Sequence, residues 1–360
     1  MKNLTIKKIA FGILLAGYAS SSAFALDAKT TSLISGNKPI LTAQKDGAQD
    51  HTLTVRITSD EEGKNQIGNR AAKTGDYIVI KFNVSDADGD LDTGKIKDTL
   101  KVYIKKSTGA WSEITNLDSL KATNDGAKGQ ISFKIDNSFI GANYVGFKLL
   151  ERTDYGLPYA NQWLQVNDIW AKGSAPSVVD PIKPDDPENT PPEGLGPDPE
   201  TEKHGPGDVT GDDGFGPIGS EKLRVGIFLV EGGAPNKAKN YANTSKPDLT
   251  LVPTYGDKFA AIVWEDNDGN GVVDANELEV TDSYQFEWRL DGEYEGVKAG
   301  GSSANSYTLP LTRGASSSKD LGNNDLYTLG ALTPGAKHNS IYATRFKAGA
   351  QGFNLRVNTK

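Results

Sequence analysis

Short segments in which apolar and polar side chains alternate run through most of this sequence, and they constrain the fold more than any other feature. Residues 77–84 read YIVIKFNV, which places Ile78, Ile80, Phe82 and Val84 on one face of an extended chain. No window of a dozen residues has the 3.6-residue periodicity of an amphipathic helix. The sequence therefore predicts an all-β fold of antiparallel β-sandwiches. Similar strand-like runs occur in residues 99–106, 131–135, 222–230, 259–264, 284–290 and 352–357.

The first 25 residues predict export. Lys2, Lys7 and Lys8 precede an apolar run over residues 9–17, and Ala23-Phe24-Ala25 is a small-x-small cleavage site, so residues 1–25 are expected to be a Sec signal peptide. The run is shorter than the roughly 20 residues that span a bilayer. We therefore expect a secreted protein, extracellular or associated with the cell surface after periplasmic transit, with no membrane span.

Composition narrows the functional classes. Removing the three signal lysines changes the net charge from −8 to 36 − 47 = −11. An acidic surface disfavours nucleic acid and anionic lipid as partners, because phosphate binding needs clustered Lys and Arg. There is no cysteine, and no methionine follows Met1. Disulfides and thiolate chemistry are therefore excluded, and the domains must fold on core packing alone.

A proline-rich acidic segment divides the chain. Ten of the 17 prolines fall between Pro176 and Pro217, and such composition predicts an extended spacer without a core. We expect an N-terminal immunoglobulin-like β-sandwich over residues 26–172, a disordered Pro/Asp/Glu-rich linker over 173–221 and a C-terminal immunoglobulin-like β-sandwich over 222–360. The halves also share a pattern, GDYIVIKFNVSDADGD from Gly75 and GDKFAAIVWEDNDGN from Gly256, which favours duplication of one domain.

The loop from Asp266 to Glu277 fits the template of a calcium-binding loop. Oxygen ligands recur at positions 1, 3, 5, 7, 9 and 12, and Gly271 stands at position 6, where the chain must bend sharply. Calcium takes six to eight oxygens, and this spacing supplies them from one short segment. The flanking segments have strand patterns, not the helices of an EF-hand. The predicted ligands are Asp266, Asp268, Asn270, the Val272 carbonyl, Asp274 and Glu277.

Two alternatives stay open for the acidic turns. The loop can be an Asx-rich turn between strands whose side chains satisfy backbone donors and bind nothing. A second calcium site at Asp86, Asp88, Asp90 and Asp92 is a weaker hypothesis, because position 12 of that loop is Lys97 in place of a glutamate.

Catalytic motifs are scarce. The three histidines, His51, His204 and His338, have no metal-ligand spacing, and the sequence contains no G-x-S-x-G motif or P-loop. We therefore expect no enzyme. Trp264 and Trp288 occupy inward strand positions and are expected in the core. The aromatic run with Tyr155, Tyr159, Trp163 and Trp170 is either a recognition face or an additional edge strand folded back on the N-terminal domain.

GDYIVIKFNVSDADGD, GDKFAAIVWEDNDGN and YQFEWRLDG, together with the export signal and the lack of cysteine, give the chain a resemblance to a known family. It resembles the enterobacterial secreted immunoglobulin-fold exoproteins of the zinc-regulated Zir type, which act with an intimin/invasin-like outer-membrane barrel. The resemblance covers both predicted domains but not the spacer. It implies immunoglobulin-like folds, export, and a role in adhesion or virulence through protein–protein contacts.

These observations predict a secreted, non-enzymatic adhesion or protein-interaction protein. Its expected partner is a protein, either an outer-membrane β-barrel translocator or a host surface receptor. The alternative is a calcium-dependent, lectin-like module that binds a glycan through the loop at Asp266, and an exposed Trp or Tyr beside that loop would favour it.

Overall fold

A computed structural model describes residues 28–107, 109–181, 204–210, 212–298, 325–329 and 351–359. The chain divides into two compact units, residues 1–36 and residues 37–360. The described part of the first unit, residues 28–36, contains no helix or strand, and the expected signal peptide lies outside the described residues. None of the helices in the described ranges has the length and hydrophobicity that a membrane crossing requires.

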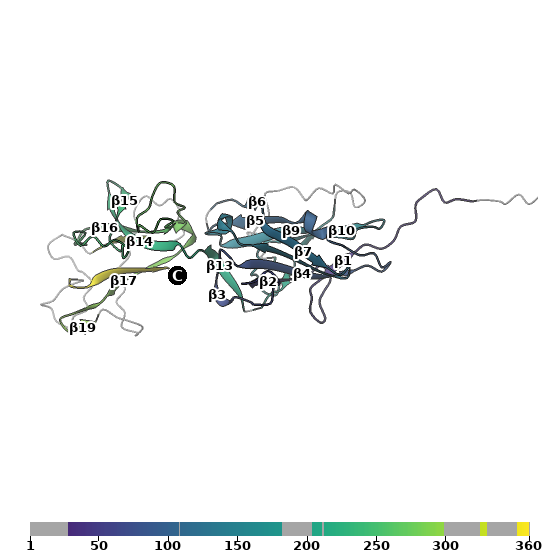
Figure 1. Cartoon of the computed structure of the whole chain (residues 1–360), viewed down its shortest axis with the longest axis horizontal. Coiled ribbons are helices and arrows are strands. Elements are labelled where there is room, and N and C mark those ends of the chain that lie inside the picture. The colour runs from purple at the N-terminus through teal and green to yellow at the C-terminus, as the bar shows by residue number, and fades with distance from the viewer. Residues whose placement is uncertain are drawn as a thin grey trace, which may run out of the picture. The chain divides into compact units, whose positions relative to one another are not determined.

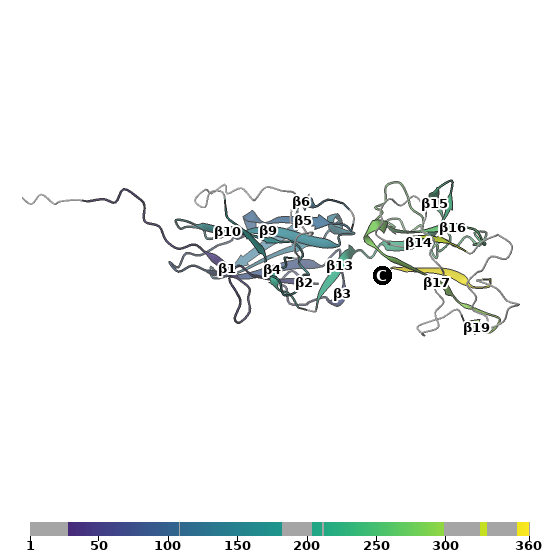
Figure 2. The same cartoon turned by 180° about the vertical axis from the view of Figure 1, so that it is seen from behind.

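Two sheets form the N-terminal half. The first has the order β12-β2-β4-β8-β7, with β1 also paired to β4, and the second has the order β11-β10-β9-β5-β6. Both views show β5, β9 and β10 in one layer and β1, β2 and β4 in the other (Figures 1 and 2). The strands of the first sheet are β1 (Ile40–Thr42), β2 (Leu53–Thr58), β4 (Tyr77–Ser85), β7 (Asp118–Asn124), β8 (Lys128–Lys134) and β12 (Gly207–Asp208). Those of the second are β5 (Lys101–Lys105), β6 (Ser112–Ile114), β9 (Tyr144–Arg152), β10 (Ala160–Val166) and β11 (Ser177–Val179).

One hydrophobic core lies between these two sheets. Ile78, Ile80 and Phe82 of β4 are buried, as the period-two pattern predicts, and they pack with Val102 of β5 and Phe147 of β9. Short 3-10 turns, η1 (Ile96–Thr99) and η2 (Asn137–Phe139), lead from strands of the first sheet toward the second. The sheets therefore pack face to face as a β-sandwich.

The C-terminal half has a second core. Its larger sheet has the order β15-β14-β16-β20, and β17 pairs antiparallel with β21. Trp288 of β17 is fully buried and stacks on Tyr327 of β20 at 5.2 Å between ring centroids. Trp264 is also fully buried, but it lies in a separate cluster with Phe228 and Ile262. Of the two tryptophans expected in the core, only Trp288 is therefore there. The elements are β14 (Leu223–Glu231), β15 (Ala234–Asn240), β16 (Lys258–Glu265), η3 (Thr281–Ser283), β17 (Phe286–Asp291), β18 (Glu293–Tyr294), β19 (Val297–Lys298), β20 (Leu326–Thr328) and β21 (Asn354–Thr359).

The order of elements in the two halves is similar. β2 pairs antiparallel with β4, and β14 pairs antiparallel with β16. β4 and β16 are each followed by an acidic loop, a 3-10 turn (η1 or η3) and a strand, β5 or β17. The predicted all-β fold is therefore confirmed, and the shared order supports the duplication hypothesis. The immunoglobulin-like assignment of each half stays a prediction.

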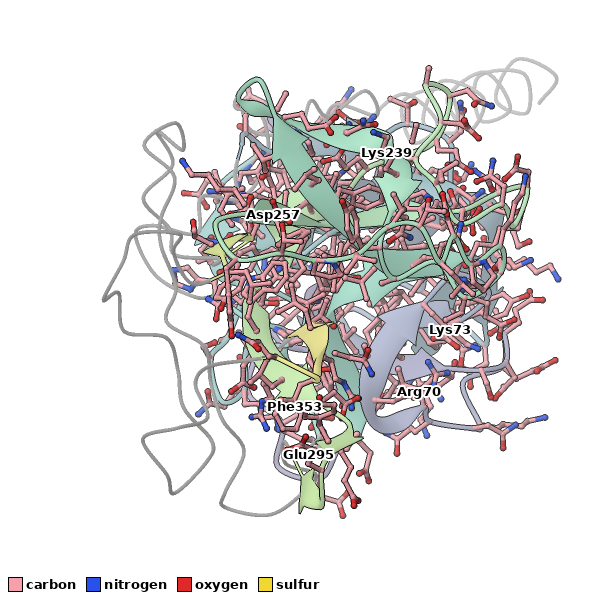
Figure 3. All side chains as sticks on the ribbon, turned by 90° about the vertical axis from the view of Figure 1, so that its left-hand side faces the viewer. Arg70, Lys73, Lys239, Asp257, Glu295 and Phe353 are labelled. Carbon is pink, nitrogen blue, oxygen red and sulfur yellow. The ribbon has the colours of Figure 1, made fainter. Side chains whose placement is uncertain are left out.

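The segment expected as a disordered linker, residues 173–221, contains strands at both ends. β11 pairs with β10, β12 pairs with β2, and β13 (Asp213–Gly219) pairs in parallel with β3 (Gly68–Lys73). The ammonium group of Lys73 in β3, which is labelled in Figure 3 together with Arg70, lies 2.5 Å from the carboxylate of Glu221 at the end of this segment. The expectation of disorder is therefore wrong for these ends, because partner strands distant in sequence supply the pairing. Residues 182–203 lie outside the described residues.

Candidate cation site

The loop over residues 266–277 leaves β16 and returns to the same strand. The Glu265 amide donates to the Leu278 carbonyl at 2.9 Å, and Trp264 and Glu279 form an isolated antiparallel bridge. Gly269 and Gly271 both have φ near +75°, a conformation that side chains with a Cβ rarely adopt. The predicted bend at Gly271 is therefore present, and the loop is closed at its base.

The loop brings three of its predicted ligands together. Carboxylate oxygens of Asp266, Asp268 and Glu277 all lie within 4.8 Å of one another. Among the described residues, no lysine or arginine forms an ion pair with any of the three. Negative charges at this separation repel one another, and a divalent cation between them would remove that repulsion.

Asp266 supplies an observation that points to a ligand. Its side chain is 4 % exposed, and its Oδ2 accepts from the Gly271 amide at 3.2 Å. Its Oδ1 is buried and has no hydrogen-bond partner. A buried polar atom without a partner destabilises a fold by about 1–3 kcal/mol. A cation coordinated by Oδ1 would offset this penalty. An Asx turn alone would not, because its side chains accept backbone amides and Oδ1 accepts none.

Asn270 and Asp274 lie beside this cluster. The Asn270 amide nitrogen donates to Asp268 Oδ2 at 2.9 Å and to Asp274 Oδ2 at 2.8 Å, while its Oδ1 accepts from the Val272 amide at 2.8 Å. A half-turn of the amide would exchange its nitrogen and oxygen and present the oxygen to a cation. Asp274 is outside the group of three, which suits position 9 of a calcium loop, where a water often intervenes.

Backbone donors hold the carboxylates in place. Glu277 accepts from the Asn267 amide at 2.7 Å through Oε1 and from the Asp274 amide at 3.1 Å through Oε2. Asp268 Oδ1 accepts from the Asn270 amide at 3.0 Å. These bonds fix the side chains before any cation arrives, so the arrangement is preorganised for oxygen coordination.

The sequence reasoning did not find two asparagines that support the loop. Asn240, at the end of β15, donates to the Gly271 carbonyl at 2.7 Å, and Asn243 donates to the Asn270 carbonyl at 2.9 Å. A Cβ on Gly271 would lie 2.2 Å from Asn243 Oδ1. The loop also places Val273 against Phe228 and Trp264 on the outer face of the sheet. These contacts join segments about 30 residues apart, and no local pattern signals them.

The N-terminal acidic loop brings together only part of its predicted site. Asp86, Asp88 and Asp90 have carboxylate oxygens within 4.8 Å of one another. Asp86 Oδ2 is buried without a hydrogen-bond partner, as Asp266 Oδ1 is, although the Asp86 residue as a whole is half-buried. Asp88 accepts from the Asn37 side chain at 2.8 Å. Because this loop has Lys97 at position 12 in place of a glutamate, it has a weaker basis for a cation site than the loop at Asp266.

Asp92 has a structural role in that loop. Its side chain is fully buried, and its Oδ1 accepts from the amides of Gly94, Lys95 and Ile96 at 3.0, 2.7 and 3.2 Å. Its Oδ2 accepts from Asn124. Asp92 is outside the cluster of three because these donors direct its carboxylate toward the start of η1, so it organises the turn.

The histidines within the described ranges make structural contacts. His51 Nδ1 lies 3.0 Å from both carboxylate oxygens of buried Glu151, and His204 Nδ1 lies 3.2 Å from the Ala175 carbonyl. His338 lies outside the described residues.

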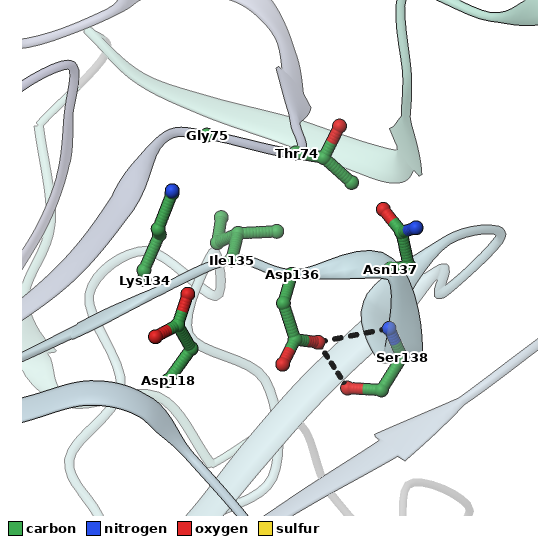
Figure 4. A pocket seen from close by; sticks show the side chains of 8 residues that line it. All are labelled: Thr74, Gly75, Asp118, Lys134, Ile135, Asp136, Asn137 and Ser138. Carbon is green, nitrogen blue, oxygen red and sulfur yellow. Dashed lines mark hydrogen bonds between the residues drawn. The ribbon is translucent and has the colours of Figure 1, made fainter.

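An open pocket of about 590 Å³ lies at Thr74 and Asp136 (Figure 4). There Asp136 accepts from the Ser138 amide at 2.8 Å and from its hydroxyl at 2.5 Å, which caps η2.

The aromatic run of residues 155–170 is mostly structural. Trp163 lies in β10 and is buried, and Tyr159 packs against it and under the guanidinium of Arg152. Trp170 packs on the N-terminal core and donates to the Asp213 carbonyl at 3.2 Å. Only Tyr155, at 79 % exposed, presents its ring to solvent. The run therefore supplies an additional strand of the N-terminal domain. The expected edge position is wrong, because β10 pairs with both β9 and β11.

Comparisons with models of known families, with curated proteins and with solved structures find no match for this chain.

Proposed function

We propose that this chain is a secreted, non-enzymatic binding protein of a bacterial surface, in which a calcium ion in the loop at residues 266–277 stabilises the C-terminal sheets. The observation that carries the calcium part of the proposal is the buried, unpartnered Oδ1 of Asp266 beside two further carboxylates. Calcium is the expected ion because the predicted ligands are all oxygens at the spacing of a calcium-binding loop, and calcium takes six to eight oxygen ligands, whereas zinc prefers nitrogen and sulfur.

The all-β architecture supports a recognition role more than a catalytic one. Loops between sandwich strands carry function while the sheets hold them in place. Among the described residues, the polar side chains of the acidic loop are carboxylates and amides, and His51 and His204 make structural contacts. A protein partner on the producing cell's outer membrane or on a host surface fits the expected export, and the resemblance to secreted immunoglobulin-fold exoproteins favours the same class of partner.

A glycan-binding role receives less support at this loop. Sugar recognition commonly stacks an aromatic ring on the sugar, and the aromatic residue next to the loop, Trp264, is fully buried. The large apolar side chain beside Glu277 is Leu278, at 36 % exposed. We therefore propose protein recognition ahead of a lectin-like activity.

Two measurements test this function. The purified mature chain is used to capture partners from the solubilised outer membrane of the producing cell, in calcium and in EDTA, with the Asp266→Asn variant as a matched bait. Recovery of one membrane protein by the calcium-loaded parent chain supports the proposal. A calcium-dependent signal on a glycan array with no protein captured would favour the lectin-like alternative.

A further inference from the structure

The segment that follows the loop at Asp266, residues 278–283, lies against the strand from which the loop leaves. The Val280 amide donates to the Val263 carbonyl at 2.8 Å, and the Val263 amide donates to Thr281 Oγ1 at 3.0 Å. Val280 and Thr281 are both buried. A cation that holds the first and last carboxylates of the loop together would therefore also fix the start of this segment against β16.

The same segment contacts the N-terminal half. Ile140, which follows η2, is fully buried and packs in the C-terminal core together with Val280. A Cβ on Gly141 would lie 2.8 Å from Val280 Cγ1. Ser283 Oγ donates to the Gly141 carbonyl at 2.6 Å, and the Asn143 side chain donates to the Ser283 carbonyl at 3.1 Å. These contacts define a joint between the two halves, which consists of residues 140–143 and 280–283.

The covalent connection between the halves also reaches the loop. The Gly219 carbonyl accepts from the Thr74 amide at 2.9 Å, so the chain is still held by the N-terminal half at this point. At Lys222, the carbonyl accepts from the amide of Asp266, the first predicted ligand, at 3.1 Å. The Lys222 ammonium donates to Asn267 Oδ1 at 3.1 Å. Both routes from the N-terminal half, through the backbone and through the joint, therefore end at the base of the loop.

The carboxylates are the part of this arrangement that a cation would change. Those of Asp266, Asp268 and Glu277 lie within 4.8 Å of one another and repel when no cation is present. The repulsion acts between the two ends of the loop, one of which continues from β16 while the other continues into the joint. A cation binds more tightly when these ends are held in place than when they move apart. A ligand with such a difference in affinity shifts the equilibrium toward the ordered joint.

We propose that cation occupancy of the loop at Asp266 controls how firmly the two halves of this protein are held together at the joint. This inference rests on the proposed calcium site and adds a role for it. With calcium bound, the two halves keep one relative orientation, and after its removal they sample a range of orientations. A partner that contacts both halves would then bind the calcium-loaded chain more tightly, because less orientational freedom is lost on binding.

The absence of cysteine from the sequence allows a direct measurement of the joint. Ser112 of β6 and Ala238 of β15 are exposed, so Ser112→Cys and Ala238→Cys together place one nitroxide label on each half of the full chain. Double electron–electron resonance gives the distribution of distances between the labels. The distribution is expected to be narrower in excess calcium than in EDTA.

Calorimetry of the same labelled chain separates the two ways in which this test can fail. If calcium raises the unfolding temperature of the C-terminal half but the distance distribution has the same width in calcium and in EDTA, the role at the joint is overturned and the calcium site stands. If calcium changes neither quantity, the calcium site is overturned and the role at the joint with it.

Ile140→Ala tests the joint separately from the loop, because it removes a side chain that packs in the C-terminal core and leaves the predicted ligands in place. Its distance distribution is expected to stay broad in calcium, while calcium still raises the unfolding temperature of the C-terminal half. Ile131→Ala, at a buried isoleucine of the N-terminal core, is the matched control and is expected to keep the narrowing by calcium.

Ser283→Ala is a milder change at the joint, since it removes only the hydrogen bond to the Gly141 carbonyl. It is expected to lose part of the narrowing by calcium, and it keeps the test open if circular dichroism shows that Ile140→Ala does not fold. Narrowing equal to that of the parent chain in every joint variant that folds would contradict the assigned joint.

Discussion

A single carboxylate oxygen distinguishes the loop at Asp266 from an ordinary polar turn. Most acidic side chains in this loop accept backbone amides, as Asx turns do. Asp266 Oδ1 is buried and accepts none, while its partner oxygen is used by Gly271. The proposed cation would give this oxygen a partner and would also offset the repulsion among the neighbouring carboxylates.

Asp266→Asn is expected to abolish calcium-dependent stabilisation of the C-terminal half. The substitution keeps the shape of the side chain and removes its charge. At a calcium concentration about 100 times the dissociation constant, the parent chain gains roughly 2.7 kcal/mol by mass action, and the variant loses that gain. Thermal unfolding with and without calcium measures the difference. Asp248→Asn, at an exposed carboxylate whose hydrogen bonds among the described residues are to Thr250, should respond to calcium as the parent does.

The buried Glu151 makes the N-terminal half sensitive to pH. Its carboxylate is fully buried and accepts from the Leu41 amide at 2.8 Å, from Asn161 at 3.1 Å and from His51. The hydrogen bond to Glu151 raises the pKa of His51 above 6.5. Burial raises the pKa of Glu151, and this effect exceeds the opposing influence of His51. Leu41 lies in β1 and Glu151 lies in β9, so the hydrogen bond between them joins these two strands.

Stability of the N-terminal half is expected to fall as the pH rises above 6.5. A group whose pKa is raised by folding binds its proton more tightly in the folded state, so its contribution is complete below the unfolded pKa and is lost as the pH passes the folded value. His51 and Glu151 act in the same direction, because folding raises the pKa of both groups. Urea unfolding at a series of pH values measures the slope. An equally steep decline in His51→Gln would show that another group is responsible.

At the scale of strands, close packing can be tested at Gly129 of β8. This residue pairs with Phe82, and a Cβ there would lie 2.3 Å from the Phe82 ring. Gly129→Ala is expected to destabilise the N-terminal half by about 1–3 kcal/mol, the usual penalty for overpacking a core. Denaturant midpoints measure the change. Gly219→Ala, whose Cβ would meet its nearest neighbour at 3.8 Å, should shift the midpoint far less.

The strands and the acidic loop could be predicted from the sequence because their signals are local. Alternation identified β4, a short apolar run identified β16, and the spacing of oxygen side chains identified Asp266, Asp268 and Glu277. The position of residues 204–219 on the N-terminal sandwich could not be predicted in this way. The glycines, prolines and aspartates of this segment resemble a linker in composition, but the glycines permit close approach and the aspartates pair with Arg56, about 150 residues earlier. Pairing at that separation leaves no periodic pattern.

For the whole molecule, residues 204–219 belong to the N-terminal half, so this half extends beyond the predicted boundary at residue 172. Ile218 belongs to the N-terminal core, and β14 begins the C-terminal sheet at Leu223. A fragment ending at residue 172 therefore lacks part of its own core. It is expected to be less stable, or less soluble, than a fragment ending at residue 221, because Ile218 and the partners of Arg56 are missing. Expression of both fragments and comparison of their unfolding midpoints tests this, and equal midpoints would contradict the new boundary.

Calorimetry of the mature chain in excess calcium and in EDTA tests the proposed calcium site most directly. The C-terminal half should unfold at a higher temperature in calcium, by an amount that grows with the calcium concentration, while the transition of the N-terminal half moves little. Superimposable C-terminal transitions in the two conditions would contradict the assignment of the loop at Asp266 as a calcium site.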